Sequence, residues 1–168
     1  MKSPTNKDSV IARYIEGPTL LERALAGLKE ADLDTAPSKG GWTIRQIVHH
    51  IVDGDDLWKI CIKQALGNDQ SEFSLDWYRA LPQVTWADRW AYAQRSVDVS
   101  LALLKASRDH VMQLLEHVPD GWNRSVGFRE PNGEIEIVPV GFIIEMQADH
   151  IIHHVNQILA IQRESNNA

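Results

Sequence analysis

Five of the seven histidines lie in two short windows, and this clustering is the feature of the sequence best suited to chemistry. The first window is His49-His50, and the second holds His150, His153 and His154. Two residues four positions apart on a helix stand on the same face, one turn from each other. Because neutral imidazole is a common metal ligand, the pair His150 and His154 could hold one divalent ion between them.

In a helical projection, the side chains of His49 and His50 point in directions about 100° apart. His50 falls at the edge of the apolar stripe, one turn before Gly54, where a missing side chain would leave room for a metal, water or substrate. His49 falls on the polar side. We therefore expect His50 to point inward, and His49 and His153 to face solvent or support the site from outside. The expected metal ligands are His50, His150 and His154, a neutral triad with one position left open, as in catalytic zinc sites.

The elements that must position these histidines are four amphipathic helices. Apolar residues recur at helical spacing in four segments, and Pro18 suits the first turn of the first one. The third helix should stop at Pro119-Asp120-Gly121, because proline cannot continue a helix. We expect helices from Pro18 to about Leu33, from Thr43 to Gly67, from near Thr85 to Pro119, and from Pro139 to about Arg163.

The stretch before the fourth helix has the pattern of a β-hairpin. Apolar residues alternate on either side of Asn132-Gly133, a dipeptide typical of tight hairpin turns. A two-residue turn there would place Arg129 opposite Glu136. Residues 70–84 are expected to form a loop or a short helical turn over the bundle. The fold class predicted is all-α, a four-helix bundle with a small β-hairpin between helices three and four.

Composition limits the classes of function. The 168 residues, 43% of them hydrophobic, suffice for one domain spanning 1–168, with flexible ends expected at 1–12 and 165–168. A formal net charge of -6 offers no basic field for nucleic acid or anionic lipid. The single cysteine, Cys61, excludes an intrachain disulfide and favours a reducing, cytoplasmic location. The absence of a signal-peptide pattern and of a long apolar stretch disfavours secretion and membrane insertion.

The run GWTIRQIVHHIVDGDD (Gly41–Asp56) and the later run HIIHHVNQI (His150–Ile158) resemble the motifs of the DinB-like superfamily, in particular its YfiT-type branch of metal-dependent hydrolases. The resemblance extends from helix one to Gln162 and implies a four-helix bundle that binds zinc or nickel and often dimerises. It also implies that the metal ligands are His50, His150 and His154. The motif departs from the family's commoner HxGQ ending, because Val155-Asn156 precedes Gln157.

Relatives of this kind include transferases that join low-molecular-weight thiols, such as bacillithiol, to electrophiles. Three neutral imidazoles would leave the full charge on the ion, so a bound thiol would lose its proton without help from a protein base. The acidic residues Asp53, Glu145 and Asp149 project away from the histidine face in the helical projection. Thiol S-transfer is therefore the first expectation for the function, with a small-molecule substrate and no identifiable catalytic side chain beyond the metal ligands.

Two alternatives stay open. The same ion could activate a water molecule for hydrolysis, a reaction that normally uses a nearby acid or base. A third possibility is a non-catalytic module in which the metal is a structural clip, although structural zinc normally has four protein ligands. We also expect a homodimer, because Trp77, Tyr78, Trp86 and Trp90 look too exposed for a monomer.

Overall fold

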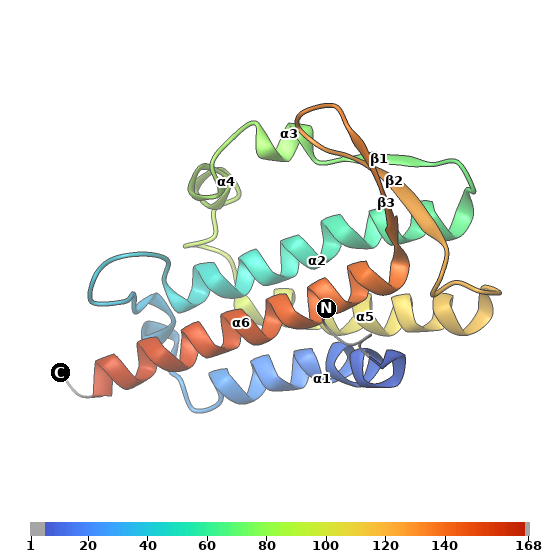
Figure 1. Cartoon of the computed structure of the whole chain (residues 1–168). Coiled ribbons are helices and arrows are strands. Elements are labelled where there is room, and N and C mark those ends of the chain that lie inside the picture. The colour runs from blue at the N-terminus through green and yellow to red at the C-terminus, as the bar shows by residue number, and fades with distance from the viewer. Residues whose placement is uncertain (1–5, 167–168) are drawn as a thin grey trace.

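The structure is a computed structural model that describes residues 6–166. Its body is a bundle of four long helices, α1 (Lys7–Leu25), α2 (Ile44–Gly67), α5 (Val97–His117) and α6 (Val140–Asn166), as Figure 1 shows. Helices α1 and α2 each pack against both α5 and α6. Residue contacts run in the same chain direction for α1 with α6 and for α2 with α5, so the bundle consists of two parallel pairs.

A small sheet and three short helical segments complete the described part of the chain. The strands are β1 (Glu72–Ser74), β2 (Ser125–Arg129) and β3 (Ile135–Pro139), in the order β1-β2-β3. The helical segments are the 3-10 helix Glu30–Asp34, α3 (Asp76–Arg79) and α4 (Gln83–Arg89). In Figure 1 the sheet, α3 and α4 lie together on the side of the bundle formed by α2. The fold class predicted from the sequence is thus confirmed, with one strand more than expected.

Helix α1 differs from the expectation in both of its ends. It begins at Lys7, so residues 7–12 are helical, and it stops at Leu25. Pro18 lies inside the helix, where it cannot donate to the carbonyl of Tyr14 four residues earlier. Arg108 of α5 supplies the missing donor, because its Nη1 lies 2.7 Å from that carbonyl oxygen. A side chain from another helix therefore makes an internal proline tolerable here.

The two helices that carry the histidine windows, α2 and α6, lie close to the ranges predicted from the sequence. Thr43 caps α2, accepting from the amide of Gln46 while the Gln46 side chain accepts from the amide of Thr43. Helix α6 begins at Val140, next to the expected Pro139, and continues through Asn166. Both helices bury long apolar stripes, and this burial fixes how each helix is turned about its own axis and therefore the direction in which each histidine points.

The third predicted helix is two helices. Helix α4 ends at Arg89, and Ala91 has a positive φ of 54°, which breaks the helical path before α5 begins at Val97. Contacts with the bundle stabilise this turn. Arg95 pairs with Asp53 of α2 at 2.9 Å, and Tyr92 is buried. These contacts lie far apart in the sequence, so helical periodicity alone could not reveal the break.

The hairpin exists, but its register is shifted by one residue from the two-residue turn considered above. Arg129 lies opposite Ile135, and Phe128 lies opposite Glu136. Arg129 instead pairs with Glu72 of β1, which runs parallel to β2. Because a one-residue shift moves side chains to the other face, Ile135 and Ile137 are exposed rather than packed on the bundle.

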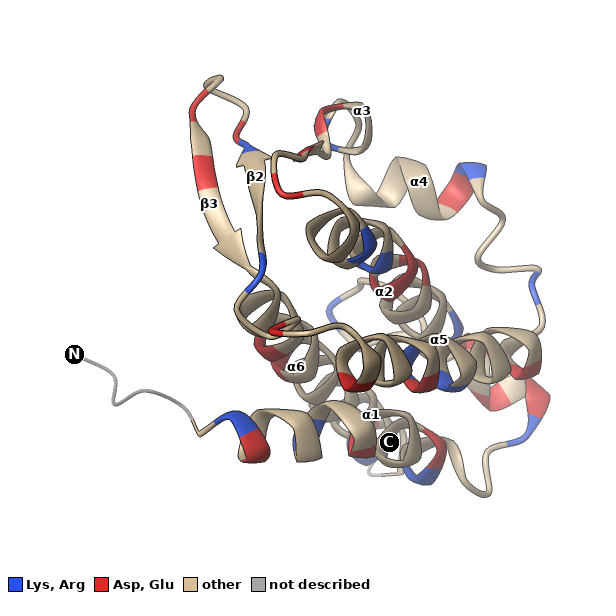
Figure 2. Ribbon diagram, turned by 90° about the vertical axis from the view of Figure 1, so that its right-hand side faces the viewer, with Lys and Arg blue, Asp and Glu red and all other residues tan. Residues whose placement is uncertain are grey.

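Acidic and basic positions are interspersed along the helices, as Figure 2 shows. Among the described residues, three charged ones are buried, Arg45, Asp55 and Arg108, and Arg108 is the least exposed of them at 1%. No helix in residues 6–166 combines the length and the apolar character needed to cross a membrane.

Candidate metal centre

The structure brings together the three histidines that the sequence selected. Nε2 of His150 lies 3.2 Å from Nε2 of His50 and 3.0 Å from Nε2 of His154. His50 comes from the second turn of α2, and the other two come from successive turns of α6, which packs against α2. All three potential ligand atoms lie within 4.8 Å of one another.

The donor set fits a tetrahedral divalent ion. A metal–nitrogen bond of about 2.0–2.1 Å in tetrahedral geometry separates the ligand nitrogens by about 3.3 Å, close to the distances seen here. Nδ1 of His154 lies 2.7 Å from Oε1 of Gln157, and this oxygen can only accept a hydrogen bond. The proton of neutral His154 is therefore on Nδ1, which leaves the lone pair of its Nε2 free on the side of His150. A divalent cation is the natural partner for three ring nitrogens that lie this close together.

Burial keeps the site in the protonation state that metal binding requires. Desolvation, helped by the neighbouring His154, lowers the pKa of His50 to about 4. The same two causes, with His50 adding to them, lower the pKa of His150 to about 3. Burial also lowers the pKa of His154, although its hydrogen bond to Gln157 opposes this. At neutral pH all three rings are thus neutral and able to act as ligands.

Of the two histidines expected outside the site, one is placed as expected and one is not. His153 is exposed. His49 is fully buried, which contradicts the expectation that it faces solvent. Its Nδ1 lies 2.9 Å from the Ser100 hydroxyl and its Nε2 lies 3.2 Å from the carbonyl oxygen of Arg95, so it joins α2 to α5. The error arose because α2 packs against α5 on one side and α6 on the other, so its buried arc includes both adjacent histidines.

Cys61 is buried, as expected for a packed small hydrophobe. Desolvation raises the pKa of its thiol to about 12, so it is neither a nucleophile nor a metal ligand at neutral pH.

The sequence did not reveal a buried polar network that lies close to the histidines. Arg108 forms a two-pronged ion pair with Asp55, with N–O distances of 2.7 and 3.1 Å, and it also donates to the carbonyl oxygen of Gln147. Together with its bond to Tyr14 O, these contacts link all four long helices through one side chain. A signal was present, because Arg108 interrupts the apolar spacing between Leu104 and Val111, where a surface residue is not expected.

Two spaces meet at the triad. The first, which we call the inner pocket, encloses about 120 Å³ and is bordered by His50 and His150. Its remaining walls come from α2, α6 and the segment around α3 and α4: Gly54, Asp55, Leu57, Trp58, Leu75, Tyr78, Gln83, Met146 and Gln147. The expected space beside Gly54 is therefore present, and most of the lining is apolar.

The second space, which we call the outer groove, is larger, about 540 Å³, and is bordered by His154 and its partner Gln157. Trp42 forms part of its wall and packs against the ring of His50 at a centroid distance of 4.7 Å. Gln83, at the start of α4, borders both the outer groove and the inner pocket. The two spaces thus border different members of the triad and share Gln83 as a wall.

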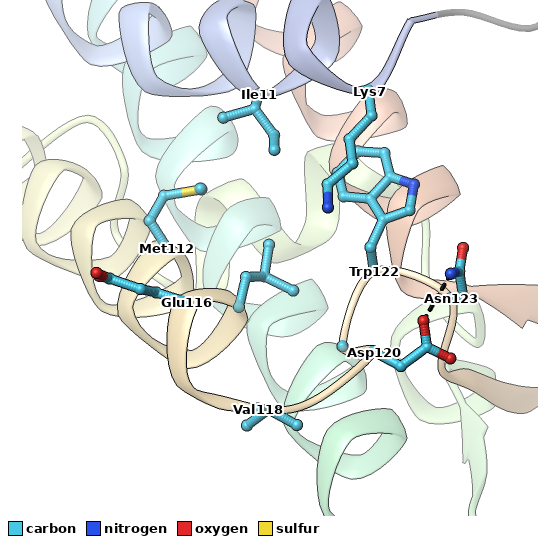
Figure 3. A pocket seen from close by; sticks show the side chains of 10 residues that line it. Lys7, Ile11, Met112, Glu116, Val118, Asp120, Trp122 and Asn123 are labelled. Carbon is cyan, nitrogen blue, oxygen red and sulfur yellow. Dashed lines mark hydrogen bonds between the residues drawn. The ribbon is translucent and has the colours of Figure 1, made fainter.

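Another hollow, of about 400 Å³, lies between the start of α1 and the end of α5. Figure 3 shows Lys7 above Trp122, at 5.4 Å from the ring centroid, and the hydrogen bond between Asn123 and Asp120. None of its lining residues borders the inner pocket or the outer groove, and none is a histidine or a cysteine. The histidine triad is therefore the better candidate for a functional centre.

Comparison with known proteins supports this choice. Residues 13–158 match the family model described as the DinB superfamily. A Bacillus subtilis protein named "Putative metal-dependent hydrolase YfiT" is 27% identical over 161 residues, which cover 96% of this chain and 86% of that protein. A relative of the same description from Oceanobacillus iheyensis is 28% identical over 145 residues, covering 86% of this chain and 78% of the relative.

Solved structures show the same architecture. The structure of YfiT from Bacillus subtilis, a four-helix bundle of unusual topology, aligns with a TM-score of 0.81 at 26% identity and covers 99% of this chain and 91% of that one. A mycothiol-dependent maleylpyruvate isomerase aligns with a TM-score of 0.63 at 15% identity, over 89% of this chain and 60% of that protein. The second likeness concerns the fold alone.

Proposed function

The chain belongs to the DinB superfamily, and on this premise we propose that it is a metal-dependent enzyme acting on small molecules, with His50, His150 and His154 as the metal ligands. The convergence of three neutral imidazole nitrogens carries this proposal. Zinc and nickel are the proposed ions, because both accept imidazole ligands. When bound, such an ion supplies a Lewis acid that can turn a thiol or a water into a nucleophile at neutral pH.

Among the reactions open to such a site, we propose transfer of a low-molecular-weight thiol to an electrophile. Two spaces that border different members of the triad suit a reaction with two substrates. Of the carboxylates that border them, Asp55 is paired with Arg108, and Glu164 accepts from the amide of Ser38. A thiol acidified at the triad needs no protein base, so the engagement of both carboxylates is no obstacle to this reaction.

Hydrolysis is the second candidate, and it is favoured by the names of the relatives from Bacillus subtilis and Oceanobacillus iheyensis. The two candidates differ in whether turnover depends on an added thiol. The reducing, cytoplasmic setting suggested by the single Cys61 accords with a thiol substrate and is part of the proposal.

One experiment separates the candidates. The purified protein, loaded with zinc or nickel, is incubated with an aryl halide and each of several small thiols, and with a panel of esters and amides without thiol. Turnover that needs both metal and thiol, and that disappears in His50→Ala but not in His153→Ala, supports thiol transfer. Thiol-independent cleavage of the esters or amides supports hydrolysis, and no metal-dependent turnover of any substrate contradicts both.

A further inference from the structure

The outer groove follows one face of α6 from the triad to a carboxylate. The residues that α6 contributes to the groove recur every three or four positions, which places them on one side of the helix: His154, Gln157, Ala160, Ile161 and Glu164. His154 and Glu164 lie about 15 Å apart along the helix axis. Along α6 the groove thus extends from a proposed metal ligand to an acidic side chain.

The lining between these two ends is uncharged and largely apolar. Trp42 and Ile47, beside and within α2, form part of the wall, and Val84 of α4 forms another part. Among residues 6–166, neither a lysine nor an arginine borders the groove, and Glu164 is the one lining residue with a charged side chain at neutral pH. Away from the metal, the groove therefore suits an apolar substrate body and offers no partner to an anionic one.

The carboxylate of Glu164 is exposed and ionised, so it is able to bind a cation. Its Oε2 lies 3.0 Å from the amide nitrogen of Ser38, and hydrogen bonds from Ser38 lower the pKa of Glu164. Lys39 contributes to this lowering of the pKa but does not border the groove. Because a carboxylate has about four acceptor positions, the bond to Ser38 leaves room for a donor from a ligand.

We infer that the outer groove binds a substrate with an elongated apolar body and a terminal ammonium group, which pairs with Glu164 while the reacting end lies at the triad. The two side chains take up part of the distance of about 15 Å, which leaves about 10 Å, the length of an eight-carbon chain. The inference rests on the proposed function, because it needs a reaction centre at the triad. It assigns a substrate class to the larger of the two spaces.

Two sets of simple thiols test the charge and the length together. Each set ends in an amine, a hydroxyl or a carboxylate, and the end group is separated from the sulfur by a chain of eight carbons in one set and of two in the other. We expect calorimetric titration of the zinc-loaded protein to show the long amine binding about threefold more tightly than the long alcohol, the factor typical of an exposed ion pair. The long carboxylate should bind most weakly.

The short thiols measure what the metal contributes without the groove. They should bind at least about tenfold more weakly than the long ones, because they bury fewer methylene groups. They should also show no preference for the amine, since two carbons do not reach Glu164. The zinc content, measured after each titration, shows that the thiols bind to the loaded protein and do not extract the ion.

Three substitutions test the assignment of the groove. Glu164→Gln keeps an acceptor for the Ser38 amide but removes the charge, so the long amine and the long alcohol should bind equally. Glu164→Lys should reverse the order and favour the long carboxylate. Ala160→Phe fills the groove between His154 and Glu164, so it should weaken the long thiols and leave the short ones unchanged.

Glu116→Gln and Glu116→Lys are the matched controls for charge. Glu116 is an exposed carboxylate that borders neither of the two spaces at the triad. Its substitutions change the net charge of the protein by the same amount as those at Glu164, and they should leave the preference for the long amine intact.

The inference is overturned if the long thiols bind without a preference for the amine, if the short thiols show the same preference, or if the preference survives in Glu164→Gln. In each of these cases, thiol binding that depends on zinc leaves the proposed function standing. If no thiol binds the zinc-loaded protein, the inference and thiol transfer fall together. A preference for the long amine that is unchanged in zinc-free His50→Ala protein would support the pairing with Glu164 and contradict the proposed role of the metal.

Discussion

At the scale of single residues, the histidines differ in what surrounds their ring nitrogens. His50, His150 and His154 turn Nε2 toward one another, whereas both ring nitrogens of His49 are engaged by Ser100 and by the carbonyl oxygen of Arg95. We expect alanine at His50, His150 or His154 to abolish the retention of one metal ion per chain, because two imidazoles hold a divalent ion much less firmly than three. Elemental analysis of each purified variant measures this.

Two other histidines serve as controls. His153→Ala should keep its metal and its stability, because the side chain is exposed. His49→Ala should keep its metal but lose about 1–3 kcal/mol of stability, since it leaves the buried Ser100 hydroxyl and the carbonyl oxygen of Arg95 without their partner. A metal-free His49→Ala protein that is otherwise folded would contradict the assignment of the ligands.

The pKa values of the triad predict how the metal-free protein responds to acid. In the unfolded chain a histidine titrates near pH 6.5, whereas burial holds the pKa of His50 at about 4 and that of His150 at about 3. Below pH 6.5 the unfolded state therefore binds more protons than the folded state, and the free energy of unfolding falls with pH. His50 alone should remove about 2 kcal/mol between pH 7 and pH 5.

Urea unfolding in the presence of a chelator, at pH 7 and at pH 5, tests this dependence. His50→Ala should show a shallower fall in stability than the unaltered chain, while His153→Ala should match it. An equal fall in all three proteins would mean that His50 does not contribute to the pH dependence.

At the scale of elements, the contact of α1 with α5 and α6 depends on Gly17, which has no side chain. A Cβ on Gly17 would lie 2.3 Å from Nη1 of Arg108 and 2.9 Å from Cγ2 of Ile151. Glycine to alanine inside a helix normally stabilises by up to about 1 kcal/mol. Here we expect Gly17→Ala to destabilise by about 2–4 kcal/mol, because the guanidinium must leave the Tyr14 carbonyl and strain its pair with Asp55.

Gly67→Ala is the matched control in urea unfolding, because a Cβ at Gly67, in the last turn of α2, meets nothing within 4 Å. It should be neutral or stabilising. A Gly17→Ala protein as stable as the unaltered chain would show that Arg108 can bind the bundle in another way.

The elements that could be predicted from the sequence are those whose signals are local. Helix α2, with its Thr43 cap, and helix α6 follow from capping and periodicity, and with them the convergence of His50 with the α6 histidines. The features that were missed depend on distant partners. Pro18 is tolerated because of Arg108, β1 exists because β2 runs beside it, and His49 is buried because α5 covers it.

At the scale of the whole molecule, the homodimer remains a prediction, but the exposed aromatic residues that suggested it are less exposed than expected. Trp77, Tyr78, Trp86 and Trp90 pack against one another, and of these only Trp77 is among the exposed large hydrophobic residues. The need for a partner to cover them is therefore weaker than the sequence suggested, although Ile135 and Ile137 are exposed. We expect light scattering at micromolar concentration to give twice the chain mass of 19.0 kDa, and a mass of 19.0 kDa would contradict it.

The bundle as a whole is held by contacts that do not involve the metal. Two apolar clusters continue from helix to helix, and Arg108 joins all four long helices. An ion bound only to the folded state adds a linked term to stability but does not replace these contacts. We therefore expect a chelator at neutral pH to remove the metal and lower the melting temperature without loss of helical circular dichroism. If helix and metal were lost together, the ion would be a structural clip, and the proposal that its open position serves catalysis would fall with it.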